Sequence, residues 1–215
     1  MVDVLPDKAA FLTEVVERVV ALSGSGQRLV RYAFTFVGLY LYKCLLGQYK
    51  DLASLKNQLE IKRKNELKLK QDDSATSKQI QALGQALQVV STSTQVLMKR
   101  IIMKRSLDVQ EIVRKSVYEF ILMMDANEVS VAFSKDNIEM LDLVFNSLRD
   151  EDSSIARIGL QIVYHILNKS IGDQDTLQVV QTRIIKEKLQ ILKMAIPGAN
   201  ATADLGSIQK ALQVI

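Results

Sequence analysis

The sequence predicts an all-α protein, and three observations lead to this fold class. The chain has only two prolines and nine glycines among its 215 residues, so few positions interrupt a helix. No stretch shows the alternation of apolar and polar residues that a half-buried strand requires. Apolar residues recur instead at spacings of three and four, which is the period of an amphipathic α-helix.

The first predicted helix lies within residues 1–26, which we treat as an N-terminal helical segment. Pro6 and Asp7 mark its start, because proline is preset for the first helical turn. Residues 23–26 read Ser-Gly-Ser-Gly and are expected to end it, because glycine adopts the left-handed conformation that closes a helix. One apolar face is expected to be buried: Phe11, Val15, Val16, Val19, Val20 and Leu22.

Residues 27–105 predict two long helices that fold back on each other, and the rest of the chain is organised around this hairpin. The second helix carries an unbroken 3-4 seam of Ile80, Leu83, Leu87, Val90, Thr94, Leu97 and Ile101. The first helix carries Leu45, Leu52, Leu55 and Leu59 in the same phase. A polar run at residues 71–77 separates the two, and two seams joined by a short polar turn predict antiparallel packing.

The two ends of the first hairpin helix differ in character. Residues 29–46 are apolar nearly all round, so we expect neighbours to enclose them and Cys44 to be a buried, inert thiol. Their most apolar part, residues 33–46, is shorter than the roughly 20 residues of a membrane span and contains Lys43. A core helix is therefore favoured, and an integral membrane bundle is only a third hypothesis. From about residue 57 the surface is charged and is expected to project into solvent.

Residues 106–215 predict shorter helices. Asp108 is expected to cap a helix that ends near Met124. Its expected buried residues are Val109, Ile112, Val113, Val117, Phe120 and Ile121. Later helices are expected at about residues 136–148, 153–168, 176–194 and 207–214.

The helices at residues 136–148 and 153–168 resemble one HEAT-type repeat. The signature is an apolar helix, an aspartate soon after it, and an aliphatic residue and an arginine opening the next helix; here it reads Leu148, Asp150, Ile155 and Arg157. We expect Asp150 to cap the second helix and Arg157 to bridge to a neighbouring repeat. Such a pair cannot bury its apolar face alone, so the sequence predicts a HEAT-like α-solenoid segment with a long antiparallel helical hairpin, part of a longer array.

Nothing in the sequence predicts catalysis. His165 is the single histidine and Cys44 the single cysteine, so no nucleophile, base and orienting group can be assembled around them. The one cysteine also excludes an internal disulfide and favours a reducing compartment. We therefore expect a non-enzymatic protein without a cofactor, metal or small-molecule substrate.

Positive charge gathers at the expected base of the hairpin. The candidate contacts are Lys99, Arg100, Lys104, Arg105, Arg114 and Lys115. A cluster of this kind neutralises phosphates without reading sequence, so it predicts contact with the DNA backbone. No aromatic residues interleave it, so stacking on single strands is not expected. A second basic run at residues 62–70 is explained equally well as a solvated helix face.

Two sets of blocks occur in the order and spacing of one known family. The first set is Phe11-Leu-Thr-Glu-Val-Val-Glu-Arg18, Arg31-Tyr-Ala-Phe-Thr35, Asn57-Gln-Leu-Glu60 and Lys62-Arg-Lys-Asn65. The second set is Arg105, Asp108, Arg114, Glu119 and Ile121, continued without gaps by Leu148, Asp150, Ile155 and Leu160. Together they resemble the cohesin subunit SA, or stromalin, family, and the second set matches the start of its stromalin conservative domain. The resemblance covers roughly residues 11–167.

The resemblance implies a role in sister-chromatid cohesion and chromosome segregation. It implies binding to the kleisin subunit, to other cohesin components and to DNA, on chromosomes in the nucleus and without a membrane. The family reads a peptide motif through an aromatic pair, and those two positions here hold Leu143 and Asn146. The alternative from another class is a cytosolic HEAT or armadillo scaffold for trafficking or complex assembly, in which the basic clusters only maintain solubility.

Overall fold

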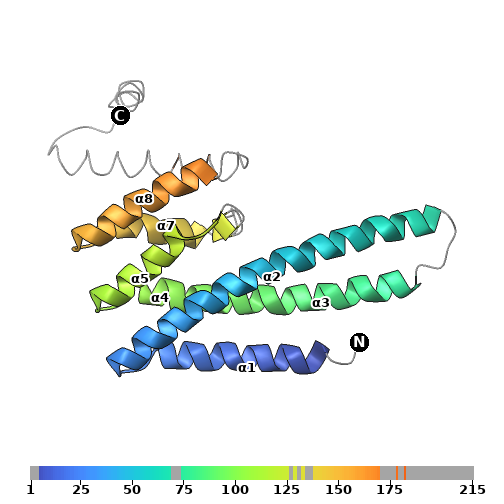
Figure 1. The fold of residues 1–215 in the computed structure, drawn as a ribbon, viewed down its shortest axis with the longest axis horizontal. Coiled ribbons are helices and arrows are strands. Elements are labelled where there is room, and N and C mark those ends of the chain that lie inside the picture. The colour runs from blue at the N-terminus through green and yellow to red at the C-terminus, as the bar shows by residue number, and fades with distance from the viewer. Residues whose placement is uncertain are drawn as a thin grey trace, which may run out of the picture.

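The computed structural model is all-helical over the residues that it describes, as the sequence predicts (Figure 1). Those residues are 5–68, 74–125, 128–129, 132–133, 138–169, 178 and 182. The helices are α1 (Leu5–Ser23), α2 (Arg28–Lys68), α3 (Ser74–Leu97), the π-helix η1 (Met98–Ile102), α4 (Met103–Arg105), α5 (Glu111–Leu122), α7 (Ile138–Ser147) and α8 (Ser153–Lys169). The helices expected at residues 176–194 and 207–214 lie outside the described residues.

The predicted hairpin is present. Helices α2 and α3 run antiparallel and pack against each other, with α1 alongside both (Figure 1). Residues 69–73 of the connection lie outside the described residues. Residues 74–77, which the sequence assigns to the turn, are already the first turn of α3.

Burial along the α3 seam falls from the base of the hairpin to its tip. At the base, Leu97 and Ile101 are completely buried, and Val90 is nearly so. Nearer the tip, Ile80, Leu83 and Leu87 are only half-buried. The reason is the number of neighbours, because α2 follows α3 to the tip and α1 ends short of it, whereas several helices surround the base (Figure 1).

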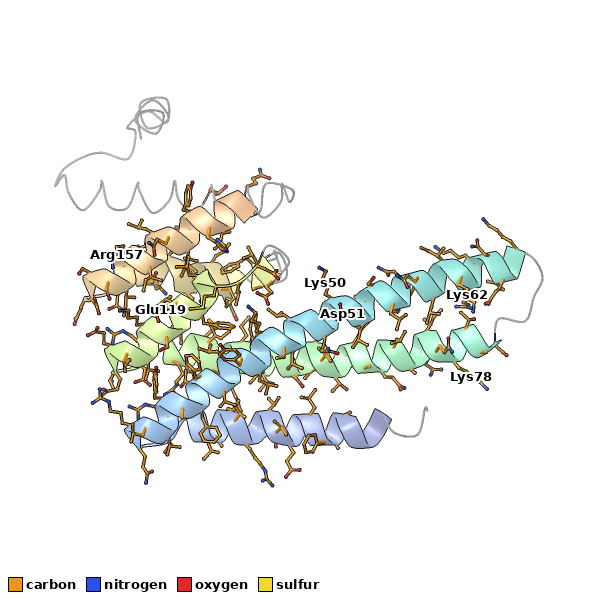
Figure 2. The ribbon with its side chains drawn as sticks, viewed as in Figure 1. Lys50, Asp51, Lys62, Lys78, Glu119 and Arg157 are labelled. Carbon is orange, nitrogen blue, oxygen red and sulfur yellow. The ribbon has the colours of Figure 1, made fainter. Side chains whose placement is uncertain are left out.

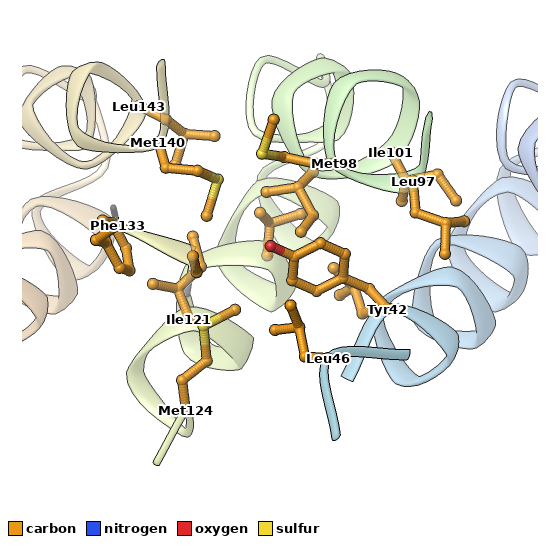
Figure 3. Packing of buried hydrophobic residues seen from close by; sticks show 14 of the residues in the cluster. Tyr42, Leu46, Leu97, Met98, Ile101, Ile121, Met124, Phe133, Met140 and Leu143 are labelled. Carbon is orange, nitrogen blue, oxygen red and sulfur yellow. The ribbon is translucent and has the colours of Figure 1, made fainter. Parts of the chain in front are cut away.

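The core lies where the hairpin base meets the later helices. Figure 3 shows Tyr42 and Leu46 of α2 beside Met98 of η1, with residues of the later helices across the same apolar space. The cluster is continuous from α1 to α8. Tyr42 packs edge-on against Phe120 at 6.3 Å between ring centroids, and burial raises its pKa, so the hydroxyl stays protonated. The fold therefore anchors the hairpin at one end only.

Gly38 allows α2 to approach its neighbours closely. A Cβ at this position would collide with Cδ1 of Ile101 in η1 and lie 3.3 Å from Cγ1 of Val19 in α1. Any larger side chain must displace these groups. Glycine is therefore required here by packing at a three-helix contact rather than by backbone conformation.

The base of α3 continues into a π-helical turn, which the sequence did not predict. The backbone N–H of Met103 donates to the carbonyl of Met98, five positions earlier. In this wider turn the consecutive side chains of Ile101 and Ile102 are both completely buried in the core. Lys99 lies in this turn, and Lys104 lies in α4 directly after it.

The prediction that neighbours enclose residues 29–46 is wrong for one face of α2. Leu29 is 82% exposed and Tyr40 is 59% exposed, and Cys44 is exposed rather than buried. The physical reason is that α1, α3, η1 and α5 all contact α2 from the other side. By length and composition α2 is also the one described helix that qualifies as a membrane span, with a third of that window buried.

Several residues expected to be buried are exposed. They are Phe11 and Leu22 in α1, Val109 before α5 and Ile112 in α5. Val109 is exposed because α5 begins at Glu111, three residues after Asp108. Residues between α4 and α5 form turns instead, one of them closed by the Gln110 N–H donating to Asp108 Oδ1 at 2.9 Å.

Helices α7 and α8 form the expected pair, and α8 packs on both α5 and α7. Gly159 of α8 marks the close contact, because a Cβ there would collide with Oγ of Ser147 in α7. The three helices lie over the hairpin base, on the side away from α1 (Figure 1). This arrangement carries the basic residues of η1 and α4 to a junction between the hairpin and the later helices.

Candidate nucleic-acid interface

The predicted contacts at the hairpin base separate into exposed and engaged side chains. Lys99, Arg100 and Lys104 are exposed, and none of them forms an ion pair with any residue that the structure describes. We call these three the base cations. They come from the π-helical turn and the short α4 that follows it.

Arg105 belongs to an internal charge cluster. Its Nη1 lies 2.8 Å from Oδ2 of Asp108, and Nε of Arg31 lies 3.1 Å from the same oxygen. The Asp108 side chain is only 3% exposed, so one buried carboxylate is shared by two guanidinium groups and offsets one of their two charges. These contacts join α2 to the segment that comes after α4.

Arg114 joins the hairpin base to the corner between α7 and α8. Its Nε and Nη2 donate to the two carboxylate oxygens of Asp150, each at 2.9 Å, and its Nη1 donates to the carbonyl of Asp108 at 2.9 Å. The Arg114 hydrogen bonds hold the pKa of the Asp150 carboxyl below its ordinary value. The guanidinium is therefore occupied by a bidentate pair and a carbonyl.

Asp152, and not Asp150, caps α8. Oδ1 of Asp152 accepts the Ser154 N–H at 2.7 Å, the geometry of an N-cap. Asp150 accepts the Asp152 N–H at 3.0 Å and otherwise holds Arg114. The predicted capping role of Asp150 is wrong because the arginine that reaches this corner comes from α5, which lies far away in the sequence.

Lys115 is half-buried beside two carboxyls. A hydrogen bond between the side chains of Glu111 and Asp152 raises the pKa of Glu111 and lowers the pKa of Asp152, and the charge of Lys115 acts on both. Its positive charge is therefore offset locally by two acidic neighbours. This leaves the base cations as the part of the predicted patch that faces solvent without a partner among the described residues.

Arg157 is exposed on α8 (Figure 2). It lines a hollow of about 510 Å³ beside α5 and α8 with Leu122, Leu160, Gln161, Tyr164 and His165. It forms no ion pair within the described part of the chain. Its predicted bridge to a neighbouring repeat stays a prediction.

Leu143 and Asn146 line a hollow of about 120 Å³ with Glu139, Asp142 and Tyr118. Burial raises the pKa of Tyr118 to about 12, so its hydroxyl is neutral. The hollow is smaller than the roughly 300–1,000 Å³ of a typical ligand pocket. Its lining includes two acidic residues, Glu139 and Asp142.

Comparison with models of known protein families gives no match, and comparison with curated proteins gives none either. The resemblance to the stromalin family therefore rests on the sequence blocks alone.

Proposed function

We propose that this chain is a non-enzymatic, HEAT-like helical scaffold that holds duplex DNA by its backbone. The observation that carries the proposal is the exposure of the base cations, Lys99, Arg100 and Lys104, without ionic partners among the described residues. Exposed cations of this kind bind phosphates by releasing counterions and do not read base edges. The nearby Arg105 and Arg114 support the site by fixing its position.

The proposed setting is cohesin. The sequence blocks that resemble the stromalin family support a cohesin-associated subunit in sister-chromatid cohesion and chromosome segregation, acting on nuclear chromosomes. The same resemblance supports binding to the kleisin subunit and to other cohesin components. The packing of α8 on α5 and α7 supports a HEAT-like repeat, in which helix pairs stack side by side.

The test of DNA binding is the triple variant Lys99→Gln/Arg100→Gln/Lys104→Gln. Log affinity for duplex DNA should fall against log salt with a slope smaller by about 2.7 than in the wild type, because each phosphate contact contributes about 0.9. The loss should be the same for two duplexes of unrelated sequence, measured by fluorescence anisotropy at several salt concentrations. The matched control is Lys50→Gln/Lys64→Gln/Arg157→Gln, which removes the same charge from three scattered exposed positions. An unchanged slope, or a loss for one sequence only, would refute the proposal.

A second candidate function is a scaffold for trafficking or complex assembly. It is favoured by the exposed apolar face of α2, where Tyr32, Phe36 and Tyr40 form a ladder with ring centroids 6.3 and 5.4 Å apart. Contiguous exposed apolar surface is typical of protein–protein contacts. If the triple variant and the wild type bind DNA equally, this candidate replaces the first.

A further inference from the structure

A stripe of polar residues runs along the exposed side of α3 from the hairpin tip to its base. Its members recur at alternating spacings of three and four, and every one is exposed: Lys78, Gln81, Gln85, Gln88, Thr92, Gln95 and Lys99. We call these seven residues the amide stripe. Because residues three and four apart are neighbours on a helix, the stripe is one continuous row.

The amide stripe carries no negative charge. Residues 74–107 contain no aspartate or glutamate, and they contain five lysines and arginines. The next acid along the chain, Asp108, is buried against Arg31 and Arg105. The stripe is therefore uncharged along its middle and positive at both ends.

The four glutamines of the stripe have side-chain N–H groups that are available to a ligand. Their side-chain amides have no hydrogen-bond partner among the residues that the structure describes. The Thr92 hydroxyl differs, because it donates to the carbonyl of Gln88 at 2.9 Å. The amide N–H groups between the two lysines are available to phosphate oxygens, since glutamine and lysine both donate to phosphates.

The length of the stripe fits a duplex. At about 1.5 Å per residue, Lys78 and Lys99 lie about 32 Å apart along the helix axis, close to the roughly 34 Å of one turn of B-DNA. Figure 2 shows Lys78 at the tip end of α3. Lys99 is itself a base cation, so the stripe ends in the proposed DNA contact.

A groove of about 460 Å³ flanks the base half of the stripe, between α3 and α1. Gln88, Thr92 and Arg100 line one wall, and Thr13 and Glu17 line the other. Glu17 is exposed and is the one carboxylate among the described residues that line it. The negative charge of Glu17 should repel an anionic ligand. Removing that charge should therefore raise the affinity, whereas adding charge to the stripe should lower it.

We infer that the amide stripe docks the backbone of double-stranded DNA over one helical turn and delivers it to the base cations. An acidic protein segment fits less well, because carboxylates seek arginine and lysine partners and the middle of the stripe has none. Single-stranded nucleic acid also fits less well, because the stripe has no aromatic side chain on which bases stack. The inference deepens the proposed function and rests on it for the end of the path at Lys99.

The experiment places negative charge on the stripe and leaves the base cations intact. In Gln81→Glu/Gln85→Glu/Gln88→Glu the helix propensity is nearly unchanged, since glutamate and glutamine rank together. The matched control is Gln48→Glu/Gln58→Glu/Gln161→Glu, which adds the same charge at exposed glutamines on other faces. Circular dichroism verifies that all variants fold, and anisotropy at one salt concentration measures binding to a duplex of two helical turns.

We expect the stripe variant to bind at least tenfold more weakly than the control variant. Glu17→Gln should bind two- to threefold more tightly than the wild type, because it removes the opposing carboxylate. Affinity should also increase steeply as the duplex is lengthened to about ten base pairs, one turn, and then only slowly. Equal displacement of DNA by poly-glutamate of matched charge would overturn the assignment to a duplex.

The stripe and the base cations fail in distinguishable ways. If the stripe variant binds like its control while Lys99→Gln/Arg100→Gln/Lys104→Gln binds weakly, the stripe is refuted and the proposed function stands. If the stripe variant binds weakly while the base variant is unaffected, the amide stripe binds DNA but the proposed contact of DNA with the base cations is refuted. If neither variant loses affinity, both proposals are wrong.

Discussion

The two halves of α2 show how differently one continuous helix can be supported. Its first half lies against α1, η1, α3 and α5, and every residue of α2 classed as buried falls between Thr35 and Leu46. Beyond Leu46 the helix has only half-buried or exposed residues over its described length. The first half of α2 therefore contributes most of the burial and the second half extends outward, because α3 is the helix that continues beside α2 to the tip (Figure 1).

Charge is divided in the same way. At the base, carboxylates such as Asp108 and Asp150 are largely buried in pairs with arginines. Along the outer half, Lys62 pairs with Glu66 at 3.6 Å, and its side chain is 62% exposed. Exposed pairs of this kind contribute only a few tenths of a kcal/mol, whereas breaking a buried pair is strongly destabilising. The base should therefore respond far more strongly to mutation.

The largest expected effect is at Arg114. Arg114→Met should reduce the free energy of unfolding by about 2–4 kcal/mol, because it leaves the Asp150 carboxylate in place without its partner. Urea unfolding followed by circular dichroism measures this. Lys62→Met in the outer half is the matched control and should change stability by less than about 0.5 kcal/mol. Equal effects of the two substitutions would show that charged pairs in the base and in the outer half contribute equally to stability.

The pH dependence of stability should identify the same pair. Because Arg114 lowers the pKa of Asp150 in the folded protein, the contribution of the pair is present above about pH 4, the unfolded value, and is lost as the pH falls further. Between pH 5 and pH 3 the free energy of unfolding should therefore fall less steeply in Arg114→Met than in the wild type. The difference corresponds to the titration of about one carboxyl group. Urea midpoints at a series of pH values test this, and parallel curves for the two proteins would contradict it.

The same Gly→Ala substitution in the base and in the outer half of the hairpin compares the packing of the two regions directly. Gly38→Ala should destabilise by about 1–3 kcal/mol, because the new methyl group collides with Ile101. Gly84 lies in the outer half of α3, where a Cβ meets nothing within 4 Å. Gly84→Ala should stabilise the protein by about 0.5–1 kcal/mol through helix propensity alone. Chemical denaturation measures both, and effects of the same sign would show that the two sites are packed alike.

A modest effect is expected at the α8 cap. Asp152→Ala should lower the melting temperature by roughly 2–4 °C, because the Ser154 N–H loses its acceptor. Asp152→Asn should retain most of that stability, since asparagine caps equally well. Thermal melts decide the matter. A wild-type melting temperature for the alanine variant would show that the cap is redundant with the α7–α8 packing.

Features set by local periodicity could be predicted from the sequence. The 3-4 seam ending at Leu97 and Ile101 indicated the helical type, the hairpin and which face of α3 meets α2. The start of α8 was also predictable, because a run of acidic residues, 150–152, precedes a hydrophobic helix. In each case, the information lies within a few turns of the chain.

Features that depend on distant contacts were not predictable. Arg114 meets Asp150 across 36 positions, and no local pattern indicates that a basic residue will be neutralised there. For the same reason, the exposed face of α2 was missed, because composition shows that the helix is apolar but not how many neighbours reach it. The extra residue of the π-turn interrupts the 3-4 period only after Leu97, too briefly to be read from sequence.

The one-sided anchoring of α2 makes the hairpin a lever. Leu46, its last buried residue, acts as the fulcrum, and Lys68 lies about 33 Å beyond it. A tilt of about 5° at Leu46 displaces Lys68 by about 3 Å. A small rearrangement among the side chains around Leu46 is therefore amplified into a displacement of atomic size at the far end, and a load on the far end is returned to the base as torque.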